Sequence, residues 1–333
     1  MEEYAYRLTQ ELFKLGCKIT VLCEKNYTTP AKGISFIELG EHSKPHWLSH
    51  YRFSNKVNFW MTANLQSGCI VHSHERQAVH HVSTFHTTPF NLGKIRVARF
   101  LSLRNFFYEK LEKRELLGPN TRAVVPVSNL LGDLMRAKHP EAAEVIKKAI
   151  HPGVDLRLSV AQSNRRIPHD GGTIGFIGKE WKRKGLPKAI RIWRELKKTR
   201  PNLKLKIAGV CSEVLSHLIE NSDVNVEILG FVKNKRSFYE SIDLLLHPAK
   251  LEAFGMVISE ALCIHVPVIC SSECGASEVL SKSSSFHIPE GQSDASWVQA
   301  ADEILRISKL KFLSPKRWDD VAKEYKQLYK KIQ

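Results

Sequence analysis

Two glutamates and a glycine in one short stretch are the residues of this chain that could do chemistry together. The stretch 252–260 reads E-A-F-G-M-V-I-S-E, so Glu252 and Glu260 stand eight positions apart with Gly255 between them. An apolar run of strand length, residues 243–248, precedes it, and apolar residues at helical spacing follow it. Because glycine lets a backbone approach a ligand, we predict a strand, a tight turn and a helix whose first N–H groups face an anion. The alternative is that Glu252 caps the helix and Glu260 lies on a solvated face.

A second group of candidates is basic. The run T-I-G-F-I-G, which ends at Gly178, predicts a strand, and K-E-W-K-R-K-G follows it. In a parallel sheet this loop and the glutamate turn both lie at the carboxyl ends of strands, where ligands bind. Arg183 and Lys184 could together neutralise a diphosphate, with two solvated side chains as the alternative.

Histidines gather between residues 72 and 86. They follow no recognised metal spacing, and histidines at strand ends commonly line pockets, so we predict no metal site. His86, which ends V-S-T-F-H, is the candidate pocket residue, with an ordinary strand-to-loop turn as the alternative. The cluster consists of His72, His74, Glu75, His80, His81 and His86.

Composition indicates a two-domain protein with anionic partners. The 333 residues exceed what one core usually supports, and no apolar stretch reaches the ~18 residues of a membrane span. Seven scattered cysteines predict reduced core thiols of a cytoplasmic protein. A net charge of +16 favours nucleic acid, an anionic membrane or phosphate-bearing substrates. Residues 94–114 form a basic, aromatic segment, which predicts either a helix at a membrane surface or a domain helix with a solvated basic face.

The order of predicted elements divides the chain. Strands alternate with helices at the spacing of a mainly parallel sheet, and the polar segment 159–172 lacks periodicity. We predict a first domain at 1–158, a linker at 159–172, a second domain at 173–315 and a C-terminal helix at 316–333. The chain opens with a helix over residues 2–15, where such a domain normally starts with a strand and a glycine-rich turn. We therefore expect the first strand to be missing, through truncation or a wrong start site.

Three motifs resemble a known family. K-R-K-G-L after T-I-G-F-I-G, E-A-F-G-M-V-I-S-E-A-L and H-P-G-V-D look like the family 4 retaining glycosyltransferases of GT-B fold. D-L-L-L-H-P-A-K-L-E-A-F-G followed by V-P-V-I-C-S-S-E-C-G-A-S is most similar to the lipopolysaccharide core α-1,3-glucosyltransferases. The resemblance is strong over residues 172–280 and weak over the first 120. It implies an α/β architecture of two Rossmann-like doubly wound domains that face each other across a cleft. Residues 1–158 would then be the acceptor-side domain, residues 173–315 the nucleotide-sugar-binding domain, and the helix at 316–333 would cross back to the first domain.

The resemblance also implies roles for individual residues. Glu252 would contact the donor sugar, Glu260 would accept hydrogen bonds from the ribose, and His86 would lie beside the sugar. Arg183 and Lys184 would stabilise the departing UDP diphosphate. The remaining donor-binding positions are Gly178, Phe254, Gly255, Met256 and Val257.

The expected function is transfer of a hexose, glucose from UDP-glucose, to a lipopolysaccharide-core or related cell-envelope acceptor with retention of configuration. UDP-sugar is then a substrate, and we expect neither a metal, nor a cofactor, nor a protein nucleophile. The acceptor would be a phosphorylated or anionic glycolipid, and the enzyme would be cytoplasmic, with peripheral contact at the inner face of the inner membrane. Alternatives are a family 4 transferase with another donor for capsule or O-antigen, and a truncated, non-catalytic nucleotide-sugar-binding protein. Nucleic-acid binding is not expected, because the chain lacks an aromatic-basic recognition motif.

Overall fold

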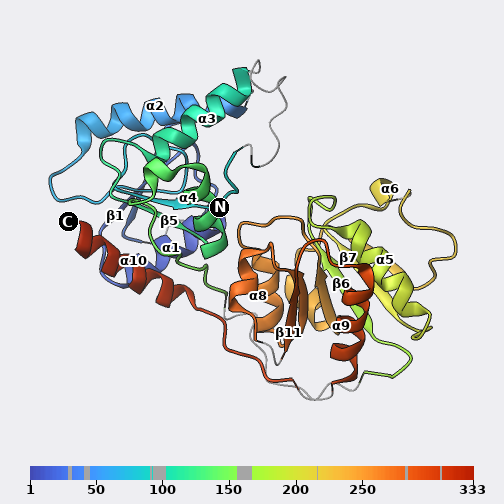
Figure 1. Cartoon of the computed structure of the whole chain (residues 1–333). Helices are drawn as coiled ribbons and strands as arrows, with labels where there is room; N and C mark the ends of the chain where they lie inside the picture. The colour runs from blue at the N-terminus through green and yellow to red at the C-terminus, as the bar shows by residue number, and fades with distance from the viewer. Residues whose placement is uncertain are drawn as a thin grey trace. The chain divides into compact units, whose positions relative to one another are not determined.

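The computed structural model of the chain describes residues 1–28, 32–40, 46–90, 92, 103–155, 167–215, 217–281, 284–307 and 310–333. The chain forms two compact units (Figure 1): Met1–Gly153 together with Trp318–Gln333, and Val154–Arg317. Most of the predicted linker and residues 94–102 of the basic segment lie outside the described ranges.

The second unit is built on one six-stranded parallel sheet. Its strand order is β11-β10-β9-β6-β7-β8, so the chain starts in the middle and moves first to one edge and then to the other. The carboxyl ends of all six strands therefore lie at one edge of the sheet. The strands are β6 (Thr173–Ile177), β7 (Lys204–Ala208), β8 (Val226–Gly230), β9 (Leu244–His247), β10 (Val268–Ser271) and β11 (Ser285–Ile288).

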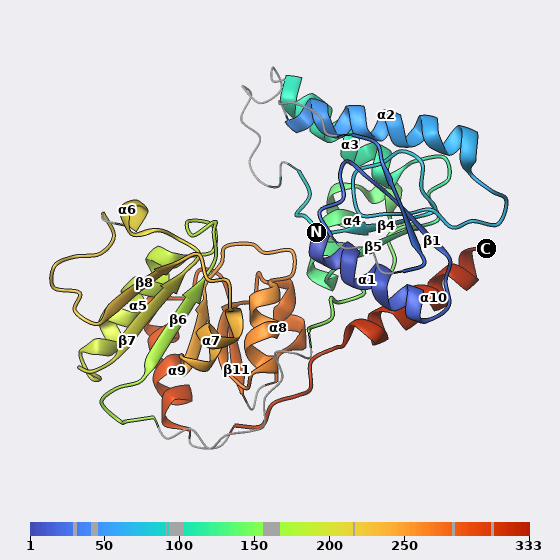
Figure 2. The same cartoon turned by 180° about the vertical axis from the view of Figure 1, so that it is seen from behind.

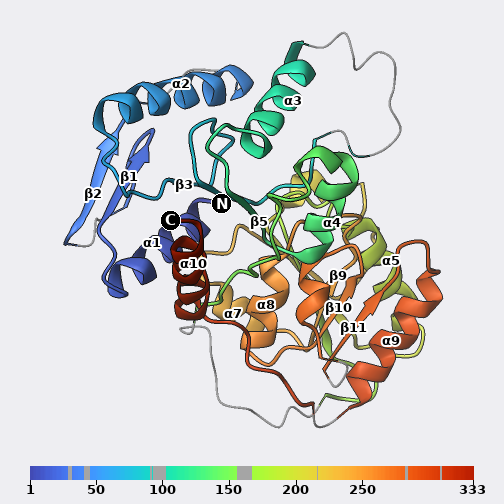
Figure 3. The same cartoon turned by 60° about the vertical axis from the view of Figure 1, so that its left-hand side comes forward.

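Helices cover both faces of this sheet (Figures 1 and 3). Helices α5 (Leu186–Lys197) and α9 (Asp294–Arg306) pack together on one face, and α8 (Met256–Cys263) lies on the other. The core on the α5 and α9 side contains the buried indoles of Trp193 and Trp297. The short helices α6 (Ser212–Leu215) and α7 (Lys235–Glu240) complete the unit.

The first unit contains two parallel sheets. Strand β1 (Ile19–Cys23) pairs with β2 (Ile34–Glu38), and β4 (Val82–Phe85) lies between β3 (His72–Ser73) and β5 (Ala123–Pro126). Helices α1 and α10 pack side by side (Figure 2), and the hydroxyls of Tyr4 and Tyr325 are 3.2 Å apart at their contact. The helices are α1 (Glu2–Lys14), α2 (His46–Asn64), α3 (Leu103–Leu116), α4 (Asn129–Lys138) and α10 (Trp318–Ile332).

Several sequence-based expectations differ from the structure. The residue types of 274–280 predict an ordinary helix, but the structure has a 3-10 helix at Gly275–Val279. The apolar run 68–72 predicts a strand, but the structure has only the two-residue strand β3, which begins at His72. Strand β11 and helix α9 were not predicted. The seven cysteines are free, but Cys69 and Cys211 are exposed, so these two are not core thiols.

Within the described ranges, no helix combines the length and the apolar character that a bilayer-spanning segment needs.

Candidate active site

The turn that carries Glu252 joins β9 to α8. All four residues of β9 are buried, and the chain leaves the sheet at its carboxyl end. Gly255 caps α8 with φ of 96°, and a Cβ atom there would lie 3.2 Å from Cδ1 of Ile258 and 3.4 Å from Cγ of Glu252. Only glycine adopts this left-handed conformation without strain, so the residue type fixes where the helix begins.

The loop after β10 holds the backbone of this turn. The N–H of Glu252 donates to the carbonyl oxygen of Glu273 at 2.9 Å, and the N–H of Gly275 donates to that of Glu252 at 3.0 Å. The N–H of Ala276 donates to the carbonyl oxygen of Phe254 at 2.7 Å, and the Phe254 side chain is buried. Because the backbone is held on both sides, rearrangement at Glu252 is confined to its side chain.

The basic loop after β6 delivers two cations to this carboxylate. Nη1 of Arg183 donates to Oε2 of Glu252 at 2.9 Å and to the carbonyl oxygen of Leu251 at 2.8 Å. Nζ of Lys184 lies 3.6 Å from the same Oε2. The structure therefore brings Arg183 and Lys184 together with Glu252, which lies 69 residues after Arg183 in the sequence.

Gly178 explains how Lys184 reaches this position. A Cβ atom at residue 178 would lie 2.4 Å from Cδ of Lys184, so the lysine stem crosses the end of β6 in space that only glycine leaves open. The N–H of Gly178 donates to the carbonyl oxygen of Ala208 at 3.0 Å and holds the end of β6 against β7. Gly178 therefore acts on the site indirectly, by leaving the space that the Lys184 side chain occupies.

Arg183 remains charged in this setting. Burial lowers its pKa, but the neighbouring carboxylates of Glu252 and Glu180 more than offset that effect, and the pKa is raised overall. Its Nε also donates to Glu180. An arginine shared between two carboxylates keeps its positive charge at any pH at which the protein is folded.

Glu260 has a separate set of partners. It lies in α8 beyond the half-buried residues Met256 and Val257, and it is itself buried. Its Oε1 accepts a hydrogen bond from Nζ of Lys235 at 2.7 Å, and its Oε2 accepts one from the hydroxyl of Tyr239 at 2.7 Å. Burial raises the pKa of Tyr239 well above its ordinary value, and Glu260 adds to that effect. The alternative of a solvated Glu260 is therefore wrong.

Sequence reasoning missed three side chains around the two glutamates. Lys235 and Tyr239 lie in α7, and His247 ends β9, with its Nε2 atom 3.9 Å from Oε2 of Glu252. The only signal for His247 was a polar residue closing the apolar run D-L-L-L-H. Nothing in the local pattern around Lys235 or Tyr239 indicates a contact with α8, because that contact depends on how the two helices pack.

The thiols of Cys270 and Cys274 lie beside this group. Both are fully buried, and Cys274 pairs through a single β-bridge with Glu252. The hydrogen bond with Cys270 lowers the pKa of Cys274, burial opposes the shift, and His247 adds to it.

His86 belongs to the first unit. Its Nε2 atom lies 3.0 Å from Nδ1 of His74, and the ring of Tyr4 meets it edge-on at 4.7 Å between centroids. Burial lowers the pKa of His86 well below its ordinary value and that of His74 to about 3. Both imidazoles are therefore neutral at pH 7, which suits hydrogen bonding and not charge stabilisation.

The described residues contain no group of three or more His, Cys, Asp or Glu side chains arranged to hold a metal ion. The histidine cluster between residues 72 and 86 lies within the described part of the chain and does not form such a group.

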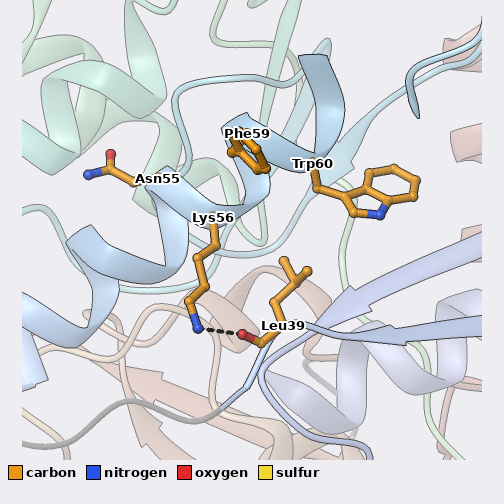
Figure 4. A pocket seen from close by; sticks show the side chains of 5 residues that line it. All are labelled: Leu39, Asn55, Lys56, Phe59 and Trp60. Atoms are coloured by element: carbon orange, nitrogen blue, oxygen red, sulfur yellow. Dashed lines mark hydrogen bonds between the residues drawn. The ribbon is translucent and has the colours of Figure 1, made fainter. Parts of the chain in front are cut away.

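Glu252 lines neither of two open hollows at the surface of the described residues. One, of about 380 Å³ in the first unit, lies between α2 and the end of β2 (Figure 4), with Nζ of Lys56 bound to the carbonyl oxygen of Leu39 at 2.6 Å. Its lining is mostly apolar, with Phe59 and Trp60 at its wall. The other, of about 430 Å³ in the second unit, adjoins the basic loop at Lys182 and Gly185. The candidate residues of the second unit form a cluster of ion pairs and hydrogen bonds.

Two family models together match nearly the whole chain. Residues 1–158 match "Glycosyltransferase Family 4", and residues 161–325 match "Glycosyl transferases group 1". The capsular polysaccharide biosynthesis glycosyltransferase CapM of Staphylococcus aureus is 28% identical over 134 residues, 38% of this chain and 35% of that protein. An uncharacterized glycosyltransferase of Methanocaldococcus jannaschii is 28% identical over 214 residues, 57% of this chain and 54% of that protein. The chain thus spans about half or less of the length of these curated relatives.

Solved structures share the fold. WaaG, a glycosyltransferase involved in lipopolysaccharide biosynthesis, matches with a TM-score of 0.76 and 19% identity, over 98% of this chain and 91% of that one. The HepE protein of Anabaena matches with a TM-score of 0.56 and 16% identity, over 90% of this chain and 86% of that one. The predicted α/β GT-B fold is confirmed, and the chain belongs to the glycosyltransferases built from a family 4 domain and a group 1 domain.

Proposed function

We propose that this chain is a retaining glycosyltransferase that transfers glucose from UDP-glucose to a lipopolysaccharide-core or related cell-envelope acceptor. The observation that carries the proposal is the convergence of Arg183 and Lys184 on Glu252 at the carboxyl ends of β6 and β9. Two cations beside a carboxylate suit a substrate that carries a diphosphate next to hydroxyl groups.

The chemistry follows from these charges. As the bond between the sugar C1 and the diphosphate oxygen breaks, negative charge grows on the departing UDP, and the Arg183 guanidinium and Lys184 ammonium stabilise it. The acceptor hydroxyl forms the new bond to C1 on the same face, and its proton passes to a phosphate oxygen of the leaving group. Glu252 orients the sugar hydroxyls, and Glu260 accepts from the ribose. Because the two cations supply positive potential, the proposal includes no metal and no cofactor.

The proposed donor and acceptor have separate support. The neighbour HepE was solved in complex with UDP and glucose, and WaaG is involved in lipopolysaccharide biosynthesis. We assign the remaining donor contacts to the backbone of Phe254, Gly255 and Met256, beside which Val257 lies. We assign a contact with the donor sugar to His86.

Contact with an anionic membrane surface is part of the proposal. The net charge is +16, and Phe59 of α2 and Phe106 of α3 are 80% and 59% exposed in the first unit. Exposed aromatic rings on a basic protein favour the interface of an anionic bilayer, where a glycolipid acceptor would be presented.

The test is transfer and donor hydrolysis with a panel of nucleotide sugars. We expect turnover with UDP-glucose and a loss of at least 100-fold in kcat/KM for Lys184→Ala, because a missing cation at the leaving group costs a few kcal/mol in the transition state. Lys182→Ala is the matched control: it removes one positive charge from the same loop, but Nζ of Lys182 lies over the ring of Trp181. Equal activity of the Lys184→Ala and wild-type proteins would refute the site.

Two alternatives correspond to other outcomes of the same panel. Turnover with another nucleotide sugar would identify that sugar nucleotide as the donor. The similarity to CapM would then favour a capsule acceptor. Binding of UDP without turnover of any donor would indicate a non-catalytic nucleotide-sugar-binding protein.

A further inference from the structure

The two cations that should bind the donor diphosphate are already engaged. Arg183 and Lys184 both approach a single atom, Oε2 of Glu252, at 2.9 and 3.6 Å. The side chains of Lys184 and Glu252 are only 15% and 14% exposed, so water screens this contact weakly. A diphosphate that draws both cations to its oxygens therefore competes with the Glu252 carboxylate for them.

A displaced carboxylate needs a new partner. Leaving an ionised carboxylate without compensation in a largely buried site is strongly unfavourable. The backbone of Glu252 is held by the loop after β10, so the new partner must lie within a side-chain rotation of the present position.

His247 meets this requirement. Its imidazole is fully buried, and neither ring nitrogen has a hydrogen-bond partner of good geometry in the described part of the chain. Its Nε2 atom lies 3.9 Å from the same Oε2 of Glu252, about 1 Å beyond a normal hydrogen bond. The thiol of Cys274 adjoins the ring, but sulfur is a weak donor and acceptor and leaves the imidazole largely unsatisfied. A buried orphan donor next to a carboxylate that must move is otherwise an unexplained penalty.

We infer that His247 is a positioning residue that receives the Glu252 carboxylate when a nucleoside diphosphate occupies Arg183 and Lys184. The inference rests on the proposed function. In the ligand-free protein Glu252 occupies the cations, and in the complex it turns to Nε2–H of His247 and faces the sugar. His247 thereby lowers the free energy of the donor complex without contacting the donor.

The experiment is a double-mutant cycle on UDP binding, measured by titration calorimetry. We expect His247→Phe to weaken UDP about tenfold, and His247→Gln, which keeps an N–H donor, to stay within about threefold of the wild type. Glu252→Ala should tighten UDP binding several-fold, because the cations no longer need to be released. In the Glu252→Ala background, His247→Phe should change the affinity by less than twofold.

The outcomes separate the inference from the proposed function. An equal loss for His247→Phe with and without Glu252 would mean that the residue acts only on the fold, and the inference would be wrong. Weaker UDP binding by Glu252→Ala would also overturn it, and this result does not depend on the folding of the His247 variants. Wild-type protein that does not bind UDP at all would overturn the proposed function itself. UDP binding with no coupling would overturn only the inference.

Discussion

Replacing Gly178 by alanine should weaken donor binding while leaving the fold intact. A Cβ atom at residue 178 would lie 2.4 Å from Cδ and 3.3 Å from Cε of Lys184, and it would touch no backbone within that range. Ordinary carbon contacts are about 3.5–4.0 Å, so the lysine stem must move by about 1 Å. Because a lysine stem is flexible, the protein should accommodate this movement at small cost in stability.

The magnitude follows from Coulomb's law. With an effective dielectric constant of about 20, moving an ammonium from about 3 Å to about 4 Å from a phosphate oxygen loses about 1.4 kcal/mol, which is about tenfold in affinity. We therefore expect Gly178→Ala to raise the Kd for UDP about tenfold in titration calorimetry. Its melting temperature should stay within a few degrees of the wild type.

Gly185→Ala is the matched comparison in the same loop. Gly185 has φ of 81°, and a Cβ atom there would lie 1.9 Å from the carbonyl oxygen of Pro248, which is backbone. This substitution should unfold the second unit or lower its melting temperature strongly. In the Lys184→Ala background, Gly178→Ala should have no further effect on UDP affinity. A loss that persists in that background, or a Gly178→Ala protein as unstable as Gly185→Ala, would refute the reasoning.

Three further predictions concern buried polar groups. Burial raises the pKa of Glu115 from 4.5 to about 7, so the stability that its protonated form contributes is complete below pH 4.5 and is lost as pH rises through 7. In urea titrations, the free energy of unfolding of the wild type should therefore fall by up to about 3 kcal/mol relative to that of Glu115→Gln between pH 5 and pH 8. Tyr239→Phe removes one of the two hydrogen bonds to Glu260 and should cost about 1–2 kcal/mol of stability and several-fold in UDP affinity, whereas unchanged affinity would separate Glu260 from the nucleotide. Ser128→Ala removes the side-chain acceptor for the N–H of Leu131 and should cost about 1 kcal/mol in thermal unfolding, with no change in UDP binding.

The sequence predicted those elements whose signals are local. The amphipathic spacing of residues 318–332 predicts a helix, and the structure has α10 over that range. Serine is a residue type that favours the N-cap position, and Ser128 caps α4. The 3-10 helix at Gly275–Val279 was predicted as an ordinary helix because its composition gives no sign of its partners. The amides of Gly275 and Ala276 donate to the Glu252 turn, and these bonds compete with regular helical pairing.

The candidate site was predictable in its charged residues but not in their partners. Arg183, Lys184 and Glu252 could be brought together because each follows a strand of a parallel sheet, and parallel strands end at one edge. Tyr239 and His247 were missed, since a tyrosine in a helix and a histidine at the end of a buried strand usually pack in a core. Their contacts with the two glutamates depend on the packing of α7 and β9 against α8, which no local pattern encodes.

The partners of Glu252 and Glu260 decide what the pair can do. Glycosidases use two carboxylates, one as acid and one as nucleophile or base, which requires one group to be protonated and the other to be accessible. Here Glu252 accepts from a guanidinium and lies near an ammonium, and both oxygens of Glu260 already accept hydrogen bonds, from Lys235 and Tyr239. These oxygens already face hydrogen-bond donors of the protein, so neither carboxylate is arranged to donate a proton. The pair is therefore suited to accepting hydrogen bonds from hydroxyl groups, and charge stabilisation on the leaving group falls to Arg183 and Lys184.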